Sequence, residues 1–285
     1  MIVVEWCPLP DAPPLAGLLH GCAARVVTVP SDVARDRFAD ADEIPLWIFS
    51  AKNVGIRRAR APFVLATNPD VLYTPALLRS QFESGCFYRT PRHDVRGVRT
   101  DLAPREQLRL AARSVAAVHL VGGSVTFDEP PGPLALRRAI GAYTVEQRKT
   151  APATPVERAE RPTDWLHTNA SGDFFLLHRE HWSELRGYPE RPSAGHLDSY
   201  MCAMAASAGL EQRILGGRRR LYHLDHARAV DWERQEEATH YYVPYETFLA
   251  DAREMLLGRA PYVANGERWG LGDVELPEAR VSRSV

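Results

Sequence analysis

Short apolar runs closed by proline or by turn-forming residues alternate with helical patterns through the first eighty residues. The apolar runs cover residues 2–6, 24–29 and 63–67, and the helical patterns cover residues 51–60 and a stretch that begins at Pro75. Such runs are typical of strands, and proline suits the first turn of a helix. The alternation predicts an α/β protein with a parallel sheet, and 285 residues are enough for one large core.

The pattern loosens beyond residue 100 and then returns. Residues 104–162 contain proline-rich polar stretches that resemble a surface excursion or a substrate lid more than core. Residues 173–177 read as a strand, and residues 242–257 as a final amphipathic helix. Between them, residues 197–208 have apolar positions spaced by three and four, which predicts a helix with one buried face.

Charge and cysteine content exclude several kinds of partner. The formal net charge of −1 provides no overall field that would attract nucleic acid or an anionic membrane. The four cysteines (Cys7, Cys22, Cys86 and Cys202) lie far apart, so neither zinc-ligand spacing nor a disulfide framework is predicted. No apolar run approaches the roughly 20 residues of a membrane span, and the N-terminus lacks the pattern of a signal peptide. We therefore expect a cytoplasmic protein, and an oligomer is compatible with these properties.

A polar tip follows the apolar run at residues 63–67, where the chain reads Asn68-Pro69-Asp70. Ligands bind outside the carboxyl ends of parallel strands, and a carboxylate helped by an amide can hold a divalent cation that bridges phosphates there. Asparagine and aspartate beside proline also form ordinary turns, so a plain turn is the alternative.

The helical pattern before that strand is basic. It carries Lys52 and three arginines, including Arg57, and Asn53 stands near its beginning. Free backbone N–H groups at a helix start can bind a phosphate, so this segment is a candidate anion site. A solvated basic helix face is the alternative.

The segment AKNVGIRRARAPFVLATNPDV resembles the nucleotide-sugar half of GT-A glycosyltransferases, in which an N-x-G-x-x-x-A helix precedes a strand ending in D-x-D. The resemblance extends to SGDFFLLHREHWSELRGYPE and to HLDSYMCAMAASAG, while ERWGLGD is similar to a group of bacterial, family-2-like members. It implies a single-domain GT-A-like (Rossmann-like) fold with a central, mostly parallel sheet flanked by helices. Residues 1–100 would bind the nucleotide sugar, residues 101–165 would form a variable excursion or lid, and residues 166–285 would bind the acceptor and catalyse.

The resemblance implies a glycosyltransferase, inverting in mechanism, that joins a sugar from a nucleoside-diphosphate donor to an acceptor hydroxyl. Asp198 stands at the position of the general base, although a helix-start carboxylate that complements the helix dipole is the alternative. Asn68 and Asp70 occupy the D-x-D positions. Asp70 would therefore ligate Mn²⁺ or Mg²⁺, with His223 or His226 completing the metal shell.

Further residues are expected to bind the nucleotide or the donor sugar. Glu5 ends the first strand, where the similar enzymes contact the nucleoside, and Arg92 and Asp94 fall in a region that lies beside the donor sugar. Asp173 stands where relatives contact the donor sugar or the acceptor. The complete expected set is Glu5, Lys52, Asn53, Arg57, Asn68, Arg92, Asp94 and Asp173.

Two other functions fit parts of the pattern. A sugar-1-phosphate nucleotidyltransferase has a similar sheet, but it should carry a glycine-rich, lysine-bearing loop after the first strand, which residues 5–14 (EWCPLPDAPP) lack. A non-catalytic nucleotide-sugar-binding module would keep the fold and lose the chemistry, and the amide at Asn68 is compatible with it. The sequence contains no GxGxxG, GxxxxGK[ST], HExxH or GxSxG motif.

Overall fold

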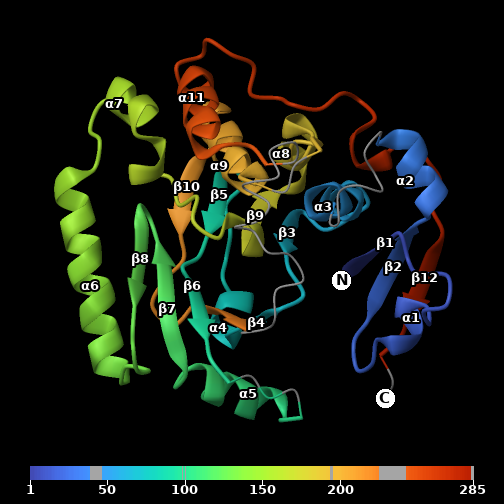
Figure 1. Cartoon of the computed structure of the whole chain (residues 1–285), viewed down its shortest axis with the longest axis horizontal. Coiled ribbons are helices and arrows are strands. Elements are labelled where there is room, and N and C mark those ends of the chain that lie inside the picture. The colour runs from blue at the N-terminus through green and yellow to red at the C-terminus, as the bar shows by residue number, and fades with distance from the viewer. Residues whose placement is uncertain (39–46, 98, 100, 193–194, 225–241, 284–285) are drawn as a thin grey trace.

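The strands and helices are described in a computed structural model that covers residues 1–38, 47–97, 99, 101–192, 195–224 and 242–283 (Figure 1). The strands are β1 (Ile2–Trp6), β2 (Ala24–Val29), β3 (Phe63–Thr67), β4 (Val71–Tyr73), β5 (Cys86–Arg89), β6 (Arg92–Val95), β7 (Val115–Leu120), β8 (Gly123–Thr126), β9 (Phe174–His178), β10 (Glu211–Ile214), β11 (Leu221–Leu224) and β12 (Glu278–Val281). The helices are α1 (Leu15–Leu18), α2 (Ser31–Arg37), α3 (Ile48–Arg57), α4 (Pro75–Leu78), α5 (Pro104–Ala111), α6 (Pro133–Thr150), α7 (Pro155–Glu160), α8 (Arg179–Leu185), α9 (Leu197–Ser207) and α11 (Tyr245–Leu256). Short 3-10 helices are η1 (Pro162–Asp164), η2 (Ser171–Asp173) and η3 (Trp269–Leu271).

The strands form three mixed sheets, in the orders β1-β2-β12, β10-β5-β9-β3 and β4-β11-β6-β7-β8. Among the described strands, the pairs β1–β2, β10–β5 and β11–β6 are parallel, and the other six pairs are antiparallel. The prediction of a single-domain α/β protein is confirmed, whereas the prediction of one mostly parallel sheet is wrong. One physical reason is that β9 lies between β3 and β5 and runs antiparallel to both.

A β-hairpin forms within residues 104–162, which the sequence pattern predicted to be a surface excursion or a lid. Strands β7 and β8 are joined by Val121 and Gly122, and Gly122 has a φ of +73°, which glycine adopts without steric cost. In β7, Val118 and Leu120 pack in the same apolar cluster as Leu136 of α6. The side chain of His119, which stands between Val118 and Leu120, therefore faces the opposite side of the sheet.

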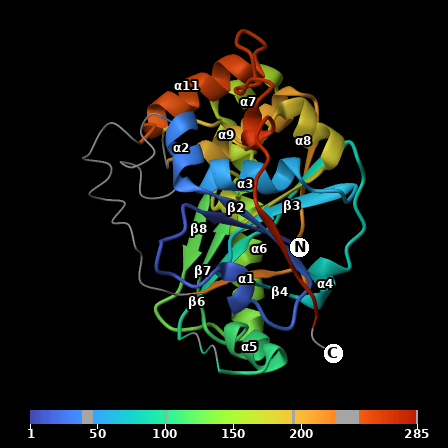
Figure 2. The same ribbon diagram turned by 90° about the vertical axis from the view of Figure 1, so that its right-hand side faces the viewer.

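The helices cover the sheets unevenly. In Figure 1, α8, α9 and α11 lie above the central strands, α6 runs along the outer side of β7 and β8, and the β1-β2-β12 sheet lies at the right. Figure 2 shows that the N-terminus lies beside this last sheet, to which β12, the last described strand, also belongs. No helix in the described part of the chain is both long enough and apolar enough to cross a membrane.

Helix α9 is buried on nearly all sides, whereas the sequence pattern predicted one buried face. Tyr200, Met201, Cys202 and Ala203 follow one another in the sequence, and each is at most 2% exposed. The helix packs against α11 on one side and shares an apolar cluster with residues of the central strands on the other, for example Phe175 of β9. A helix enclosed in this way needs apolar or small side chains all round.

Arg89, at the end of β5, is completely buried and organises a loop. Its guanidinium donates hydrogen bonds to the backbone carbonyls of His167 (2.9 Å), Asn169 (3.1 Å) and Ser171 (3.1 Å). Buried carbonyl groups that lose their donor cost free energy, because no water replaces it. Arg89 therefore fixes residues 167–171 against the central sheet.

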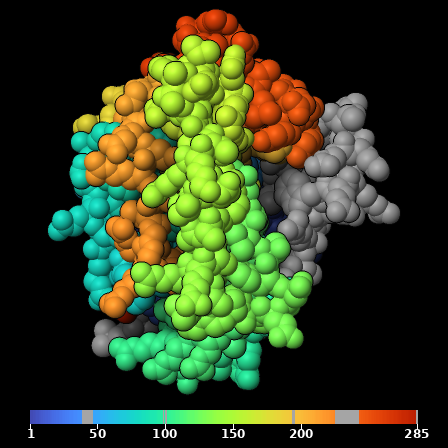
Figure 3. Space-filling model, turned by 90° about the vertical axis from the view of Figure 1, so that its left-hand side faces the viewer, coloured from blue at the N-terminus to red at the C-terminus, as the bar shows by residue number. Residues whose placement is uncertain are grey.

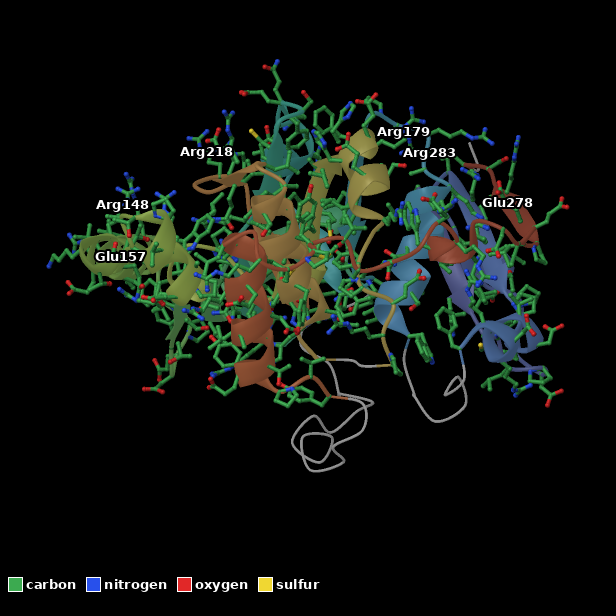
Figure 4. The ribbon with its side chains drawn as sticks, turned by 90° about the horizontal axis from the view of Figure 1, so that it is seen from above. Arg148, Glu157, Arg179, Arg218, Glu278 and Arg283 are labelled. Atoms are coloured by element: carbon green, nitrogen blue, oxygen red, sulfur yellow. The ribbon has the colours of Figure 1, made fainter. Side chains whose placement is uncertain are left out.

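We predict that Arg89→Met lowers the free energy of unfolding by about 3 kcal/mol or more, because the buried carbonyls lose their donors. Urea denaturation measures the change. Arg179→Met is the matched control, since Arg179 is an exposed arginine at the edge of the molecule (Figure 4), and it should change stability by less than about 0.5 kcal/mol. Equal, small effects of both substitutions would show that Arg89 does not hold the loop.

Candidate active site

The polar tip after β3 lies against the beginning of β9. Strands β3 and β9 are antiparallel with Thr67 opposite Phe174, so Asn68 comes beside Asp173. The Asn68 amide donates to Asp173 Oδ1 (2.6 Å), and the Thr67 hydroxyl donates to the Asp173 carbonyl (2.8 Å). Asp173 is only 4% exposed. Two segments more than 100 residues apart in sequence are therefore joined at this point.

A chain of polar side chains crosses one face of the five-stranded sheet. Ser124 Oγ lies 2.9 Å from His119 Nδ1, and His119 Nε2 lies 2.8 Å from Asp94 Oδ2. Asp94 Oδ1 lies 3.2 Å from His223 Nδ1, and His223 Nε2 lies 3.3 Å from Asp70 Oδ2. These contacts connect β8, β7, β6 and β11 to the tip after β3. We call these five residues the polar sheet face.

Arg92 ties the polar sheet face to η2. Its guanidinium contacts Asp94 Oδ1 through Nε (2.8 Å), Asp173 Oδ2 through Nη1 (3.0 Å) and His119 Nε2 through Nη2 (3.2 Å). Arg92 and Asp94 alternate along β6, so both side chains lie on one face of the sheet. The predicted residues Asn68, Asp70, Arg92, Asp94, Asp173 and His223 are thus brought together.

The charges of this cluster shift one another's pKa values. Burial alone raises the pKa of Asp94, but hydrogen bonds from His119 and His223 and the charge of Arg92 hold the pKa well below its usual range. Burial likewise lowers the pKa of His223, but its hydrogen bonds to Asp70 and Asp94 raise the pKa to about 9. His223 is therefore a cation at neutral pH.

Lys52 contacts the backbone of η2, and its ammonium interacts with three carboxylates. Its Nζ donates to the Gly172 carbonyl (2.7 Å) and lies 5.1 Å from the centre of the Phe49 ring. Burial lowers the pKa of Lys52 to about 8, although the carboxylates of Asp173, Asp198 and Asp70 favour its charged form.

Asp198 is held by the same peptide unit. The Gly172 N–H donates to Asp198 Oδ2 (2.6 Å), and the Ser199 N–H donates to Asp198 Oδ1 (2.9 Å). Asp198 is in the first turn of α9, a position where the helix dipole favours a carboxylate. The Gly172 backbone therefore binds two side chains. Its carbonyl accepts a hydrogen bond from Lys52, and its N–H donates one to Asp198.

A cavity of about 430 Å³ opens beside Asp198. Its described lining consists of Gly122, Gly123, Thr163, Thr168, Asn169, Ala170, His196, Asp198, Ser199 and Tyr245. Asp198 belongs to this described lining, whereas Asn68 and Asp70 do not. Gly172 and Asp173 connect the cavity to the tip after β3.

The other predicted donor residues make contacts elsewhere in the fold. Glu5 accepts hydrogen bonds from the Leu15 N–H (2.8 Å) and the Thr28 hydroxyl (2.9 Å). The buried Asn53 amide bonds to the Tyr188 backbone (2.8 Å) and to Glu190 (3.0 Å). These contacts tie β1 to the segment after it, and α3 to the segment after α8.

Arg57 contacts the C-terminal segment. It donates to the Glu267 carbonyl (3.0 Å) and lies over the Trp269 ring.

His226, predicted as a metal ligand, lies outside the described residues. The sequence patterns missed two members of the polar sheet face, His119 and Ser124. The alternation in β7 could have indicated His119, since it stands between the buried Val118 and Leu120.

The tip offers a partial set of ligands for a divalent cation. Asp70 and His223 lie within 3.3 Å of each other, and Asn68 Oδ1 is buried with no hydrogen-bond donor among the described residues. A carboxylate, an imidazole and an amide oxygen suit Mn²⁺ or Mg²⁺. Within the described residues, no group of three histidine, cysteine, aspartate or glutamate side chains forms a metal site, so the amide of Asn68 would be needed.

No protein-family model matches this sequence, and no curated protein matches it. Function is therefore inferred from the residues and their geometry.

We predict that Lys52 loses its proton near pH 8 in the folded chain. The sequence has only two lysines, so ¹⁵N-lysine labelling gives two side-chain signals, and Lys149, which is exposed, serves as the reference. A folded-state pKa below the ordinary value of 10.5 means that the unfolded chain binds more protons between these values.

Stability should consequently rise with pH between about 8 and 10.5, relative to Lys52→Met, by on the order of 3 kcal/mol. Urea denaturation across this range measures the difference, with Lys149→Met as the control that should follow the wild type. Parallel curves for wild type and Lys52→Met would contradict the lowered pKa.

Proposed function

We propose that the chain is an inverting glycosyltransferase with a GT-A-like fold, which moves a sugar from a nucleoside-diphosphate sugar to an acceptor hydroxyl. One observation carries this proposal. The peptide unit of Gly172 holds Asp198 at the cavity, while the next residue, Asp173, bonds to Asn68 and Arg92 beside the polar sheet face. Two consecutive residues, Gly172 and Asp173, thus hold a candidate base and a charged site suited to phosphates. The cytoplasmic location stays a prediction.

The polar sheet face would bind the diphosphate of the donor. Arg92 presents a planar cationic group that suits phosphate oxygens, and His223 adds a second positive charge while it is protonated. A metal would bind only the neutral form of His223, so metal binding would displace the His223 proton. Asp70, His223 and Asn68 would hold a divalent cation, which supplies positive charge for the departing diphosphate when bound. The fixed contacts of Arg92 with Asp94 and Asp173 keep its guanidinium oriented without the donor.

Asp198 would act on the acceptor. Its carboxylate lines the cavity and is oriented by two backbone N–H groups, so it needs little reorganisation to accept a proton from a hydroxyl in the cavity. The acceptor oxygen then attacks the anomeric carbon from the face opposite the leaving diphosphate. The proton passes from the acceptor hydroxyl to Asp198 as the new bond forms.

A non-catalytic nucleotide-sugar-binding module is the second candidate. Both oxygens of Asp198 accept backbone hydrogen bonds, which is also what a purely structural carboxylate at a helix start would do. Such a module would bind a nucleotide at the polar sheet face without releasing diphosphate.

We predict that Asp198→Asn lowers sugar transfer by about 10²–10⁴-fold, because the amide cannot accept the proton. The assay follows release of nucleoside diphosphate from UDP-, GDP-, dTDP- and CDP-sugars in the presence of a mixture of glycosides. Asp32→Asn is the control, since Asp32 is an exposed carboxylate in the first turn of α2, and it should leave the rate unchanged. Near-normal turnover by Asp198→Asn would refute the assigned mechanism. Nucleotide binding without diphosphate release by the wild type would favour the binding module.

We also predict that one nucleotide among UDP, GDP, dTDP and CDP raises the melting temperature, and that Mn²⁺ increases this shift. A ligand at 100 times its Kd stabilises the folded state by about 2.7 kcal/mol, which a thermal-shift measurement detects readily. Asp70→Asn should remove the part of the shift that depends on Mn²⁺, whereas Asp11→Asn, at an exposed position, should not. An unchanged Mn²⁺ effect in Asp70→Asn would exclude Asp70 as a metal ligand.

A further inference from the structure

The cavity beside Asp198 differs in charge from the polar sheet face. Its described lining contains the hydroxyl groups of Thr163, Thr168, Ser199 and Tyr245, together with the amide of Asn169, His196 and three small residues. Asp198 is the one carboxylate in this described lining, which includes no lysine or arginine. The volume of about 430 Å³ is in the range of pockets that enclose a small molecule.

An anionic ligand would be disfavoured in this cavity. Like charges repel each other in a partly buried site, so a phosphate or carboxylate beside Asp198 needs a cationic partner. Lys52, whose charge interacts with Asp198, and Arg89 do not belong to the described lining, and both are engaged by backbone carbonyls. Lys52 donates to the Gly172 carbonyl, and Arg89 donates to three backbone carbonyls beneath the loop.

Hydrogen bonds fix the cavity wall without a ligand. The Asn169 amide donates to the carbonyls of Gly123 (2.9 Å) and Leu120 (3.3 Å), which joins the loop held by Arg89 to the β7–β8 turn. The Tyr245 hydroxyl donates to Thr163 Oγ1 (3.3 Å). A wall held in this way binds a ligand without losing additional conformational entropy.

An aromatic surface borders the same cavity. The rings of His196 and Tyr245 are 5.4 Å apart, and His196 stacks on Phe248 at 5.8 Å with an interplanar angle of 17°. Tyr245 is 44% exposed at the beginning of α11, which lies beside α7 above α6 in Figure 3. An aromatic ring offers an apolar face to the C–H groups of a sugar, while its hydroxyl offers a hydrogen bond.

We infer that this cavity binds the acceptor, and that the acceptor is a neutral polyhydroxylated molecule, namely a sugar that carries neither phosphate nor carboxylate. The inference rests on the proposed function and names its acceptor class. Neutral hydroxyl groups match the donors and acceptors of the lining, and the ring of Tyr245 supports one face of the sugar. One hydroxyl of the sugar reaches Asp198.

Saturation-transfer NMR on the full chain tests the inference with two sets of probes. The neutral probes are methyl glucoside, methyl galactoside, methyl mannoside and maltose, and the charged probes are glucose 6-phosphate and glucuronate. At least one neutral probe should bind, and the charged probes should not. Tyr245→Ala should weaken binding of the neutral probe about tenfold, because the stacking surface is lost.

Matched variants separate the roles of the ring and of its surroundings. Tyr245→Phe keeps the ring and should retain most of the binding. Tyr262→Ala removes a tyrosine of similar exposure (38%) that does not line the cavity, and it should leave binding unchanged. Equal binding by Tyr245→Ala and Tyr262→Ala would overturn the inference, as would preferential binding of the charged probes.

Nucleotide binding, measured separately by thermal shift, distinguishes the two proposals. A nucleotide shift without Tyr245-dependent binding of any neutral probe overturns the acceptor inference and leaves the proposed function standing. Tyr245-dependent sugar binding without a shift from any nucleotide supports a sugar cavity and removes the proposed transferase. Failure of both measurements overturns both.

Discussion

The arrangement of the whole site depends on the short 3-10 helix η2, in which two consecutive residues face different partners. The Gly172 carbonyl receives Lys52 and its N–H holds Asp198, while the Asp173 carboxylate binds Asn68 and Arg92. One peptide bond joins Gly172 to Asp173. The position of Asp198 is therefore coupled to the positions of Asn68 and Arg92. Few constraints of this kind are needed to fix a charged surface and a hydroxyl-lined cavity relative to each other.

Charge balance explains why so many ionised groups can be partly buried at the tip after β3. Each carboxylate of the cluster contacts a cation or a polar hydrogen, and Arg92 contacts two carboxylates at once. In a medium of low dielectric constant an unpaired charge raises the free energy of the folded state. Removal of one member of the cluster would leave its neighbours unpaired and destabilise the fold. The cluster is therefore expected to respond as a unit to a bound anion or cation.

Local patterns predicted the local parts of this structure. The boundaries of β1, β2 and β3 follow from apolar runs closed by proline or by the tip at Asn68, because short-range propensity decides such ends. The contact of Asn68 with Asp173 could not be predicted, because it depends on an antiparallel pairing across more than 100 residues. His119 and Ser124 could not be predicted for the same reason. Their contacts with Asp94 and with each other form only when neighbouring strands pair and place them in one row.

The cavity illustrates why a substrate site can escape the sequence even when its base is predicted. Its wall comes from five separate segments, represented by Gly123, Thr163, Asn169, Asp198 and Tyr245, and only the segment of Asp198 belongs to a sequence motif. The described lining that these segments form includes no lysine or arginine. Most basic residues of the chain are arginines. A transferase joins a highly charged donor to an acceptor of different chemistry. The described lining of the cavity includes no lysine or arginine, whereas Arg92 lies beside the polar sheet face, so each substrate meets the surroundings it requires. Asp198 is the one carboxylate of that lining that faces the second substrate.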